Sequence, residues 1–345
     1  MTGMFIKKKD NILKVHKKCA ACGNKNIFNV MSLISTPFED HFLKKKDIKK
    51  NQQVFPLKLY LCKNCGNLFL LHVLSPNVSY KYYLYNTEVT LGLQKYYNQF
   101  AKKIVKKYSL KRKDKMLDIG SNDGSVLNSF KKQKLEVLGI EPAKKISLQA
   151  NKKKLKTICD FFSPQIASKL KRQNFRPKLI TANYVLANIN NLKEFAKLAE
   201  SLLDDNGILI INTGYYPQQF KIYMFDYIYH EHFSYFSIHS LKFLLKRHNM
   251  HILQIERKKP KGGSIRVFIK KNKDIKISEN INVKNYLKYE KKEKVCTLSY
   301  FNKIEKIINK MKLQLLEYLN SPNLKNLKIA GFGASHSTTI LLHHF

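Results

Sequence analysis

Arginine is scarce in this chain of 345 residues, because only six of its 64 basic residues are Arg and the others are Lys. The formal net charge is nevertheless +40. Proteins that read the base edges of nucleic acids rely on the bidentate guanidinium of Arg. The lysines are scattered over the whole chain, which favours a solvated surface over a nucleic-acid interface, although a positive field would attract an anionic substrate.

Long apolar runs are also missing. The stretches NLFLLHVL and GILII are far too short to span a bilayer. The N-terminal stretch MTGMFIKKKDNILK carries charges where a signal peptide needs an apolar core. We therefore expect a soluble cytoplasmic protein, long enough for two or three domains.

Cysteine is rare, and four of the six cysteines form two C-x2-C-G motifs: Cys19 with Cys22, and Cys62 with Cys65. Such a pair presents two thiolates to one ion, and the Gly permits a tight turn. Together the two motifs predict a structural zinc site, because four thiolates leave no coordination position open for chemistry. Two disulfides are the alternative, which a cytoplasmic setting disfavours.

The stretch KMLDIGSNDGSVLNSFKKQ predicts a short strand, a Gly-containing turn and an amphipathic helix. KLEVLGIEPA then predicts a second strand that ends in Glu141, 21 residues after Gly120. This spacing is typical of the first βαβ unit of a nucleotide-binding fold. At that position Glu141 can accept hydrogen bonds from both hydroxyls of a ribose.

The turn itself, DIGSNDG, contains Asp118 and Asp123. Two carboxylates there would repel a pyrophosphate but suit a ligand with an ammonium and a sulfonium, which predicts S-adenosylmethionine. Asp160 and Phe161, at the end of a third strand, are expected to meet the adenine. The residues assigned to the cofactor are Asp118, Gly120, Ser121, Asn122, Asp123, Gly124, Glu141, Pro142, Asp160, Phe161 and Asn183.

The remaining pattern completes an α/β sheet. PKLITANYVLANINNL and GILIINTG predict a fourth and a fifth strand, SIHSLKFLLKRH predicts a helix, and MHILQIERKK with GGSIRVFIKK predicts an antiparallel pair. Apolar residues at helical spacing between 91 and 108 predict a further helix upstream. Seven strands with this closing hairpin predict the Rossmann-like sheet of a class I S-adenosylmethionine-dependent methyltransferase.

The chain resembles the sugar C-methyltransferases, which act on nucleotide-linked keto-deoxysugars. The stretches that carry the resemblance are the two CxxCG motifs, LDIGSNDGSVL, GIEPA, IYHEHFSYFS, GGSIRVFI and IAGFGAS. It implies a zinc-binding module over 1–75 and a Tyr-rich loop with a connecting helix over 76–110. A methyltransferase domain over 111–272 and a C-terminal domain over 273–345, with a helical segment and the start of a Rossmann-like fold, would follow.

Methylation of a carbon beside a ketone needs a base, a group that stabilises the enolate, and in-line attack on the methyl group. The resemblance implies that His232 is the base, with Glu231 and Tyr229 beside it in YHEHFSY. A histidine is suited to this task. The residue types alone do not decide between His230 and His232, and we assign His230 to the substrate. A structural cluster or an H-x-H metal site is the alternative.

The same resemblance predicts further contacts to the substrate. Where related chains carry a histidine after the fourth strand, this chain has Asn188, whose amide can still donate and accept hydrogen bonds. The alternative for the GGSIR residues is a plain hairpin turn, with Arg266 as a partner for a phosphate or a core carboxylate. The residues assigned to the substrate are Tyr83, Tyr85, Asn188, His230, Gly263, Ser264 and Arg266.

The stretch LKIAGFGASHSTTILLHHF predicts a strand, a glycine turn and a helix, which could cradle a phosphate. Related chains continue beyond this point, so we expect a truncated C-terminal domain.

The predicted function is therefore base-promoted C-methylation of a nucleotide-linked keto-deoxysugar, with S-adenosylmethionine as donor and zinc as a structural ion. The alternatives are an O- or N-methyltransferase of another small molecule, or a zinc-ribbon nucleic-acid-binding protein with a vestigial methyltransferase fold. The oligomeric state is not predicted.

Overall fold

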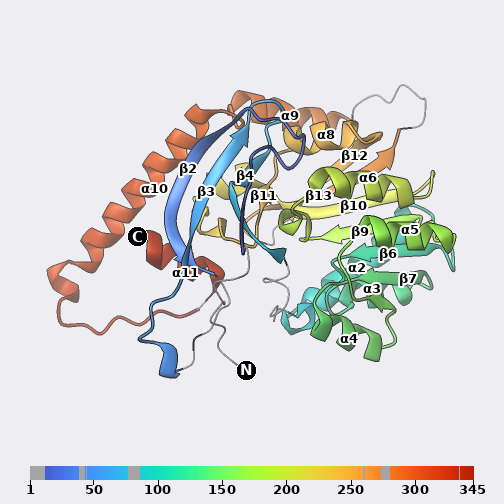
Figure 1. Cartoon of the computed structure of the whole chain (residues 1–345), viewed down its shortest axis with the longest axis horizontal. Helices are drawn as coiled ribbons and strands as arrows, with labels where there is room; N and C mark the ends of the chain where they lie inside the picture. Colours follow the sequence, from blue (N-terminus) through green and yellow to red (C-terminus); the bar gives the residue numbers. More distant parts are fainter. Residues whose placement is uncertain are drawn as a thin grey trace.

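A computed structural model describes residues 12–38, 43, 45–76, 86–258, 261–272, 280–333 and 335–345. Tyr83 and Tyr85, both assigned to the substrate, lie outside the described residues. Figure 1 shows a large sheet beside a smaller sheet that contains two long, strongly bent strands. In the described part of the chain, no helix combines the length and the apolar character needed to cross a membrane.

The large sheet has seven strands in the order β12-β13-β10-β9-β6-β7-β8. The five strands from β8 to β10 are parallel, and β13 runs antiparallel to both of its neighbours. The strands and the closing hairpin expected from the sequence are confirmed. They are β6 (Lys115–Ile119), β7 (Glu136–Ile140), β8 (Thr157–Ile158), β9 (Leu179–Asn183), β10 (Ile208–Gly214), β12 (Met250–Lys258) and β13 (Ser264–Lys271).

Both faces of this sheet are buried. Along β10, Ile208 and Ile210 join one core while Leu209 and Ile211 join the other, because successive side chains point to opposite faces. The first face is covered by α2 (Leu93–Lys107), which is the helix predicted upstream, and by α3 (Ser125–Lys131) and α4 (Lys144–Lys152). The second is covered by α5 (Pro164–Arg172), α6 (Leu192–Leu202) and α8 (Ile238–Lys246). This layering leaves the carboxyl edge of the strands for ligands.

The smaller sheet contains four antiparallel strands in the order β11-β4-β3-β2. Three of them come from the N-terminal part: β2 (Ile27–Pro37), β3 (Val54–Cys62) and β4 (Leu68–Leu70). The fourth, β11 (Ser234–Tyr235), pairs with β4 through Ser234 opposite Phe69. A short pair, β1 (Leu13–Val15) with β5 (His72–Leu74), lies beside it. The YHEHFSY stretch therefore ends in a strand of the N-terminal module.

Three helices follow the large sheet: α9 (Ile281–Lys292), α10 (Leu298–Leu319) and α11 (His336–His344). In Figure 1, α10 runs along the smaller sheet on the side away from the large one. Its Phe301 and Ile308 share a core with Met31 and Leu59. Residues 325–333 form no strand and are exposed, in contrast to the strand predicted there. A strand needs a paired neighbour, and none of the described strands pairs with this stretch.

Candidate active site and metal centre

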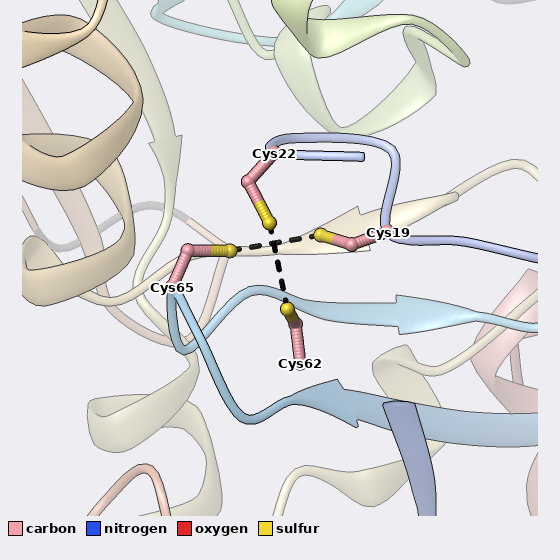
Figure 2. Close-up of side chains that lie close together, drawn as sticks. All are labelled: Cys19, Cys22, Cys62 and Cys65. Carbon is pink, nitrogen blue, oxygen red and sulfur yellow. Dashed lines mark hydrogen bonds between the residues drawn. The ribbon is translucent and has the colours of Figure 1, made fainter. Parts of the chain in front are cut away.

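The four paired cysteines converge on one point. Figure 2 shows their sulfurs pointing toward a common centre, from two loops far apart in the sequence. All four Sγ atoms lie within 4.8 Å of one another. The Sγ–Sγ distance is 3.6 Å both between Cys19 and Cys65 and between Cys22 and Cys62. A tetrahedral zinc ion with Zn–S bonds of about 2.3 Å would separate its sulfurs by about 3.8 Å, so the arrangement fits zinc.

Both cysteine loops have the same backbone. The N–H of Gly23 donates to the carbonyl of Cys19, and the N–H of Gly66 donates to that of Cys62, each over 2.9 Å. The two glycines have φ values of 76° and 67°, a left-handed conformation that a side chain would strain. The local sequence thus builds two matching turns that each aim two thiolates at one ion.

A large cavity of about 510 Å³, within the usual range for ligand pockets, lies at the carboxyl edge of β6, β7 and β9. The large cavity is lined by eight of the residues that the sequence assigned to the cofactor: Asp118, Gly120, Ser121, Asn122, Glu141, Pro142, Phe161 and Asn183. Asn188 lines it as well. The side-chain Oδ1 atom of Asn188 is buried without a hydrogen-bond partner among the described residues, so it is available to a ligand.

Three other residues assigned to the cofactor do not line this cavity. Asp123 accepts hydrogen bonds from the backbone N–H groups of Glu88 (2.7 Å) and Ser125 (3.0 Å), so its carboxylate holds the start of α3 and the loop before α2. Gly124 precedes that helix as its N-cap. Asp160 is exposed, and its Oδ1 accepts from the N–H of Phe161. These residues shape the turns around the large cavity.

Two buried carboxylates give the large cavity its charge preference. Burial raises the pKa of Asp118 to about 7, although hydrogen bonds from Thr181 and Asn183 oppose that shift. Burial also raises the pKa of Glu141, whose two oxygens accept from the N–H groups of Asn122 and Ala143, each at 2.9 Å. An acid in such surroundings is stabilised in its ionised form by a cation or by hydroxyl donors.

Arg266, which the sequence assigned to the substrate, is only 2% exposed and lies behind the large cavity. Its Nε donates to Oδ1 of Asn212 over 2.9 Å, and its Nη2 donates to the Tyr96 hydroxyl over 2.7 Å. Asn212 donates in turn to Asn183, which donates to Asp118 over 3.2 Å. Arg266 is thus the far end of a polar chain across four neighbouring strands that fixes Asp118.

His232 borders a second, smaller cavity of about 20 Å³. Its Nδ1 lies 3.3 Å from the carbonyl of Tyr227, which can only accept, so we place the ring proton on Nδ1. Its Nε2 then accepts from the Tyr229 hydroxyl at 2.9 Å. Burial, and next the charge of Lys261, lower the pKa of His232 to about 3. The imidazole is therefore neutral near pH 7.

The two histidines of YHEHFSY face different parts of the molecule. The Nε2 of His230 lies 3.2 Å from the carbonyl of Phe55 in β3, and the two rings pack edge to face. His230 is 1% exposed and lines neither cavity. Glu231 and Tyr229 are buried as well, without lining either one. The structure thus separates His230, packed against the N-terminal module, from His232 at the small cavity.

The segment that carries His232 is fixed on both sides. The N–H of Phe233 donates to the carbonyl of Ala187 over 2.7 Å, and the N–H of Leu70 donates to the carbonyl of Phe233 over 2.9 Å. Ala187 lies in η3 (Leu186–Asn188), just after β9, and Leu70 lies in β4. His232 is therefore positioned between the large sheet and the cysteine module, by which we mean the two cysteine loops with strands β2, β3 and β4.

Two residues that sequence reasoning missed connect the cavities. Tyr184 and Lys261 line both of them, and Lys261 Nζ lies 4.5 Å from the centre of the Tyr184 ring. Gly263 and Ser264, which the sequence assigned to the substrate, line neither cavity. The sequence contained a signal for both missed residues: Lys261 directly precedes the Gly-Gly turn, and Tyr184 directly follows Asn183.

Comparison with known families divides the chain into three matched parts. Residues 19–80 match a zinc binding domain, residues 93–255 match a methyltransferase domain, and residues 259–345 match a C-methyltransferase C-terminal domain. The sequence resemblance and the class I fold are thereby confirmed. The cluster of four cysteines lies in the part that matches the zinc binding domain.

A curated relative and two solved structures are similar to the chain. C-methyltransferase NovU from Streptomyces niveus is 24% identical over 335 residues, which cover 96% of this chain and 79% of the relative. A methyltransferase structure from Clostridium acetobutylicum is 14% identical, with a TM-score of 0.41, over 52% of this chain and 92% of its own. The PH0226 protein from Pyrococcus horikoshii is 13% identical, with a TM-score of 0.45, over 56% of this chain and 99% of its own.

Proposed function

We propose that this S-adenosylmethionine-dependent C-methyltransferase, whose zinc ion is structural, methylates a ring carbon of a keto-deoxysugar carried by a nucleotide. The observation that carries the proposal is the arrangement of the cavities. A large cavity with buried acids, suited to a cationic cofactor, adjoins a small one that holds a neutral, buried histidine. Thiolates that must stay reduced to bind zinc suit a cytoplasmic enzyme.

In this proposal the cofactor occupies the large cavity. Glu141 binds the ribose hydroxyls, Asp118 attracts the ammonium group, and Phe161 borders the adenine. S-adenosylmethionine supplies a methyl group on a positively charged sulfur. Asn188 and the residues between the cavities then meet the sugar, and the excess positive charge of the chain attracts the diphosphate.

The proposed chemistry takes place at the junction of the two cavities. In this proposal the Tyr229 hydroxyl first turns away from His232 Nε2, which frees the one lone pair of the neutral ring. Nε2 then removes the proton from the carbon beside the ketone, and the electrons of that C–H bond shift toward the ketone oxygen. The resulting enolate carbon attacks the methyl group, whose bond to sulfur breaks with both electrons on the sulfur. One proton therefore remains on Nε2, which can now donate to the Tyr229 oxygen before the proton leaves to solvent.

The site of methylation tests the proposal directly. The protein is incubated with methyl-labelled S-adenosylmethionine and a panel of dTDP-linked keto-deoxysugars, and the product is examined by NMR. We expect the label on a ring carbon next to the ketone. A label on oxygen or nitrogen would favour the alternative small-molecule methyltransferase and would contradict a carbon-directed reaction.

The pH dependence of cofactor binding follows from Asp118. Because its pKa is about 7 without ligand, a proton must leave before the carboxylate can pair with an ammonium group at lower pH. The affinity for S-adenosylhomocysteine should therefore rise between about pH 6 and about pH 8 and then level off. Asp118→Asn should bind more weakly and lose this rise. Calorimetric titration at several pH values measures both, and a pH-independent wild-type affinity would contradict the role of Asp118.

A further inference from the structure

Lys261 is the only described residue with a cationic side chain that lines either cavity. We propose that Lys261 is a catalytic residue whose ammonium group binds the ketone oxygen of the substrate and stabilises the enolate. This inference rests on the proposed function. The reaction requires a group that stabilises the enolate oxygen while His232 removes the proton. Lys261 is placed for this role because it lies where the large cavity meets the small cavity.

The backbone aims this side chain at the junction. Lys261 has a φ of 59°, an uncommon left-handed conformation for a residue with a side chain. Gln219, in α7 (Tyr216–Lys221), holds it there by donating from Nε2 to the Lys261 carbonyl over 3.1 Å. A Cβ on Gly262 would lie 2.0 Å from the Met224 sulfur, and one on Gly263 would lie 2.5 Å from Gln218. The glycines thus let the turn pack tightly behind Lys261.

The partner beneath the ammonium group is fixed in the same way. Tyr184, whose ring lies under Lys261 Nζ, has a φ of 55°, and its N–H donates to the carbonyl of Asn212 over 2.8 Å. A cation over an aromatic face is attracted but not neutralised. Among the described residues, no carboxylate lies within ion-pair distance of Lys261 Nζ, so its charge is available to a ligand oxygen.

The small cavity offers a second polar group without a partner. The hydroxyl of Ser234 lines it, is 1% exposed as a residue, and has no hydrogen-bond partner in the described part of the chain. A buried hydroxyl left in this state is costly unless a ligand satisfies it. The small cavity of about 20 Å³ has room for one polar group of about the size of a water molecule, so the Ser234 hydroxyl is available to such a group of a ligand.

The charges of the site support a role in stabilising an anion. Lys261 is exposed as a residue. Desolvation by the protein atoms around its ammonium group nevertheless lowers its pKa to about 8, and the charge of Glu231 opposes this shift. After burial, the charge of Lys261 and the electrostatic effect of His336 both lower the pKa of His232 and so disfavour its imidazolium form. Negative charge on a ketone oxygen beside Lys261 would cancel that repulsion. Proton transfer to His232 therefore becomes favourable only together with enolate formation.

The pH dependence of kcat should show the ionisation of Lys261. Above about pH 8 Lys261 loses its proton, so kcat should fall on the alkaline side with a midpoint near that value. In Lys261→Arg the cation persists to much higher pH, so the alkaline fall should disappear. The ionisable groups to be considered around Lys261 are Glu231, His232, Tyr184 and, through His232, His336.

The decisive experiment compares Lys261→Met, Lys261→Arg and the control Lys258→Met, whose lysine pairs with Glu256 on β12 outside both cavities. With a dTDP-linked keto-deoxysugar, Lys261→Met should lose about 10²- to 10³-fold in kcat. Its affinity for S-adenosylhomocysteine should change little. Lys261→Arg should recover part of the rate, and Lys258→Met should match the wild type. Wild-type kcat in Lys261→Met, or an unchanged alkaline limb in Lys261→Arg, would overturn the proposal.

A second measurement needs no substrate. Acetylation of the folded wild-type protein, followed by peptide mass spectrometry, gives the pH at which each lysine becomes reactive. Lys261 should react with a midpoint near pH 8, below the value of about 10.4 that a lysine has in a model peptide. A midpoint for Lys261 at that model-peptide value would refute the proposed environment. A reactive Lys261 in a protein that methylates no keto-deoxysugar would instead refute the proposed function and leave the environment of Lys261 established.

Discussion

Replacing His232 by Asn should abolish turnover while leaving the cofactor site intact. The expected loss in kcat is about 10²- to 10⁴-fold, the usual contribution of a general base. The base can be neutral and ready at neutral pH because burial lowers its pKa to about 3. Asn keeps the polarity and much of the volume of the side chain but cannot accept the proton from carbon. The measurement is kcat together with calorimetric titration of S-adenosylhomocysteine.

Two further variants separate the base from its surroundings. His251→Asn is the matched control, because His251 lies at the edge of the large sheet and hydrogen-bonds to Asn272 over 2.8 Å; it should retain the wild-type rate. His230→Asn should mainly lower the melting temperature, since His230 packs against Phe55. If His230→Asn abolished turnover in the folded protein while His232→Asn did not, His230 would be the base.

Loss of the metal centre should disable both folding and catalysis. Cys62→Ser removes one of four thiolates in a cluster whose sulfurs lie within 4.8 Å of one another. Apparent binding free energies of structural zinc reach about 10 kcal/mol or more, so we expect loss of bound zinc and a large fall in melting temperature. The metal content and the melting temperature of the purified protein measure these effects. A chelator should act in the same direction on the wild type.

The effect on catalysis follows from the position of the cysteines. Cys62 ends β3, Cys65 precedes β4, and β4 pairs with β11, which begins two residues after His232. Loosening this module should therefore reduce kcat more than it reduces cofactor affinity. The control is Cys159→Ser, because Cys159 is an exposed thiol outside the cluster. Full zinc content and full stability in Cys62→Ser would contradict the structural role of the metal.

The strands and the large cavity were readable from the sequence because their signals are local. The short apolar run of β10 and the short distance between Gly120 and Glu141 each depend on neighbours along the chain. A parallel sheet then places the carboxyl ends of its strands at one edge. Eight of the residues assigned to the cofactor line a single cavity there for this reason.

The hydrogen-bond partners of individual polar side chains could not be predicted from the sequence in the same way. Asp123 looked like a ligand-facing acid, yet its oxygens hold two backbone N–H groups. Arg266 looked like a substrate contact, yet it ends a buried polar chain through Asn212. Which partner a polar group finds is decided by segments distant in sequence, such as the loop at Glu88 or the strand next to its own.

The pairing of β11 with β4 could not be predicted from the sequence, because β11 has only two residues and is too short to show the periodicity of a strand. That contact nevertheless distinguishes the two histidines, since it places the segment between the cysteine module and β9. Lys261 was not predicted from the sequence for a different reason. One lysine among the many of this chain is not conspicuous until its backbone conformation and its position between two cavities are known.

In the proposed function, the protein forms an enolate before it transfers a methyl group. The most direct test of this step is hydrogen exchange at the substrate carbon in D2O, with S-adenosylhomocysteine bound so that no methyl group is available. We expect the wild type to exchange the hydrogen next to the ketone of a dTDP-linked keto-deoxysugar, and we expect His232→Asn to leave it in place. Methylation of carbon by a wild-type protein that catalyses no such exchange, or equal exchange by His232→Asn, would contradict this step.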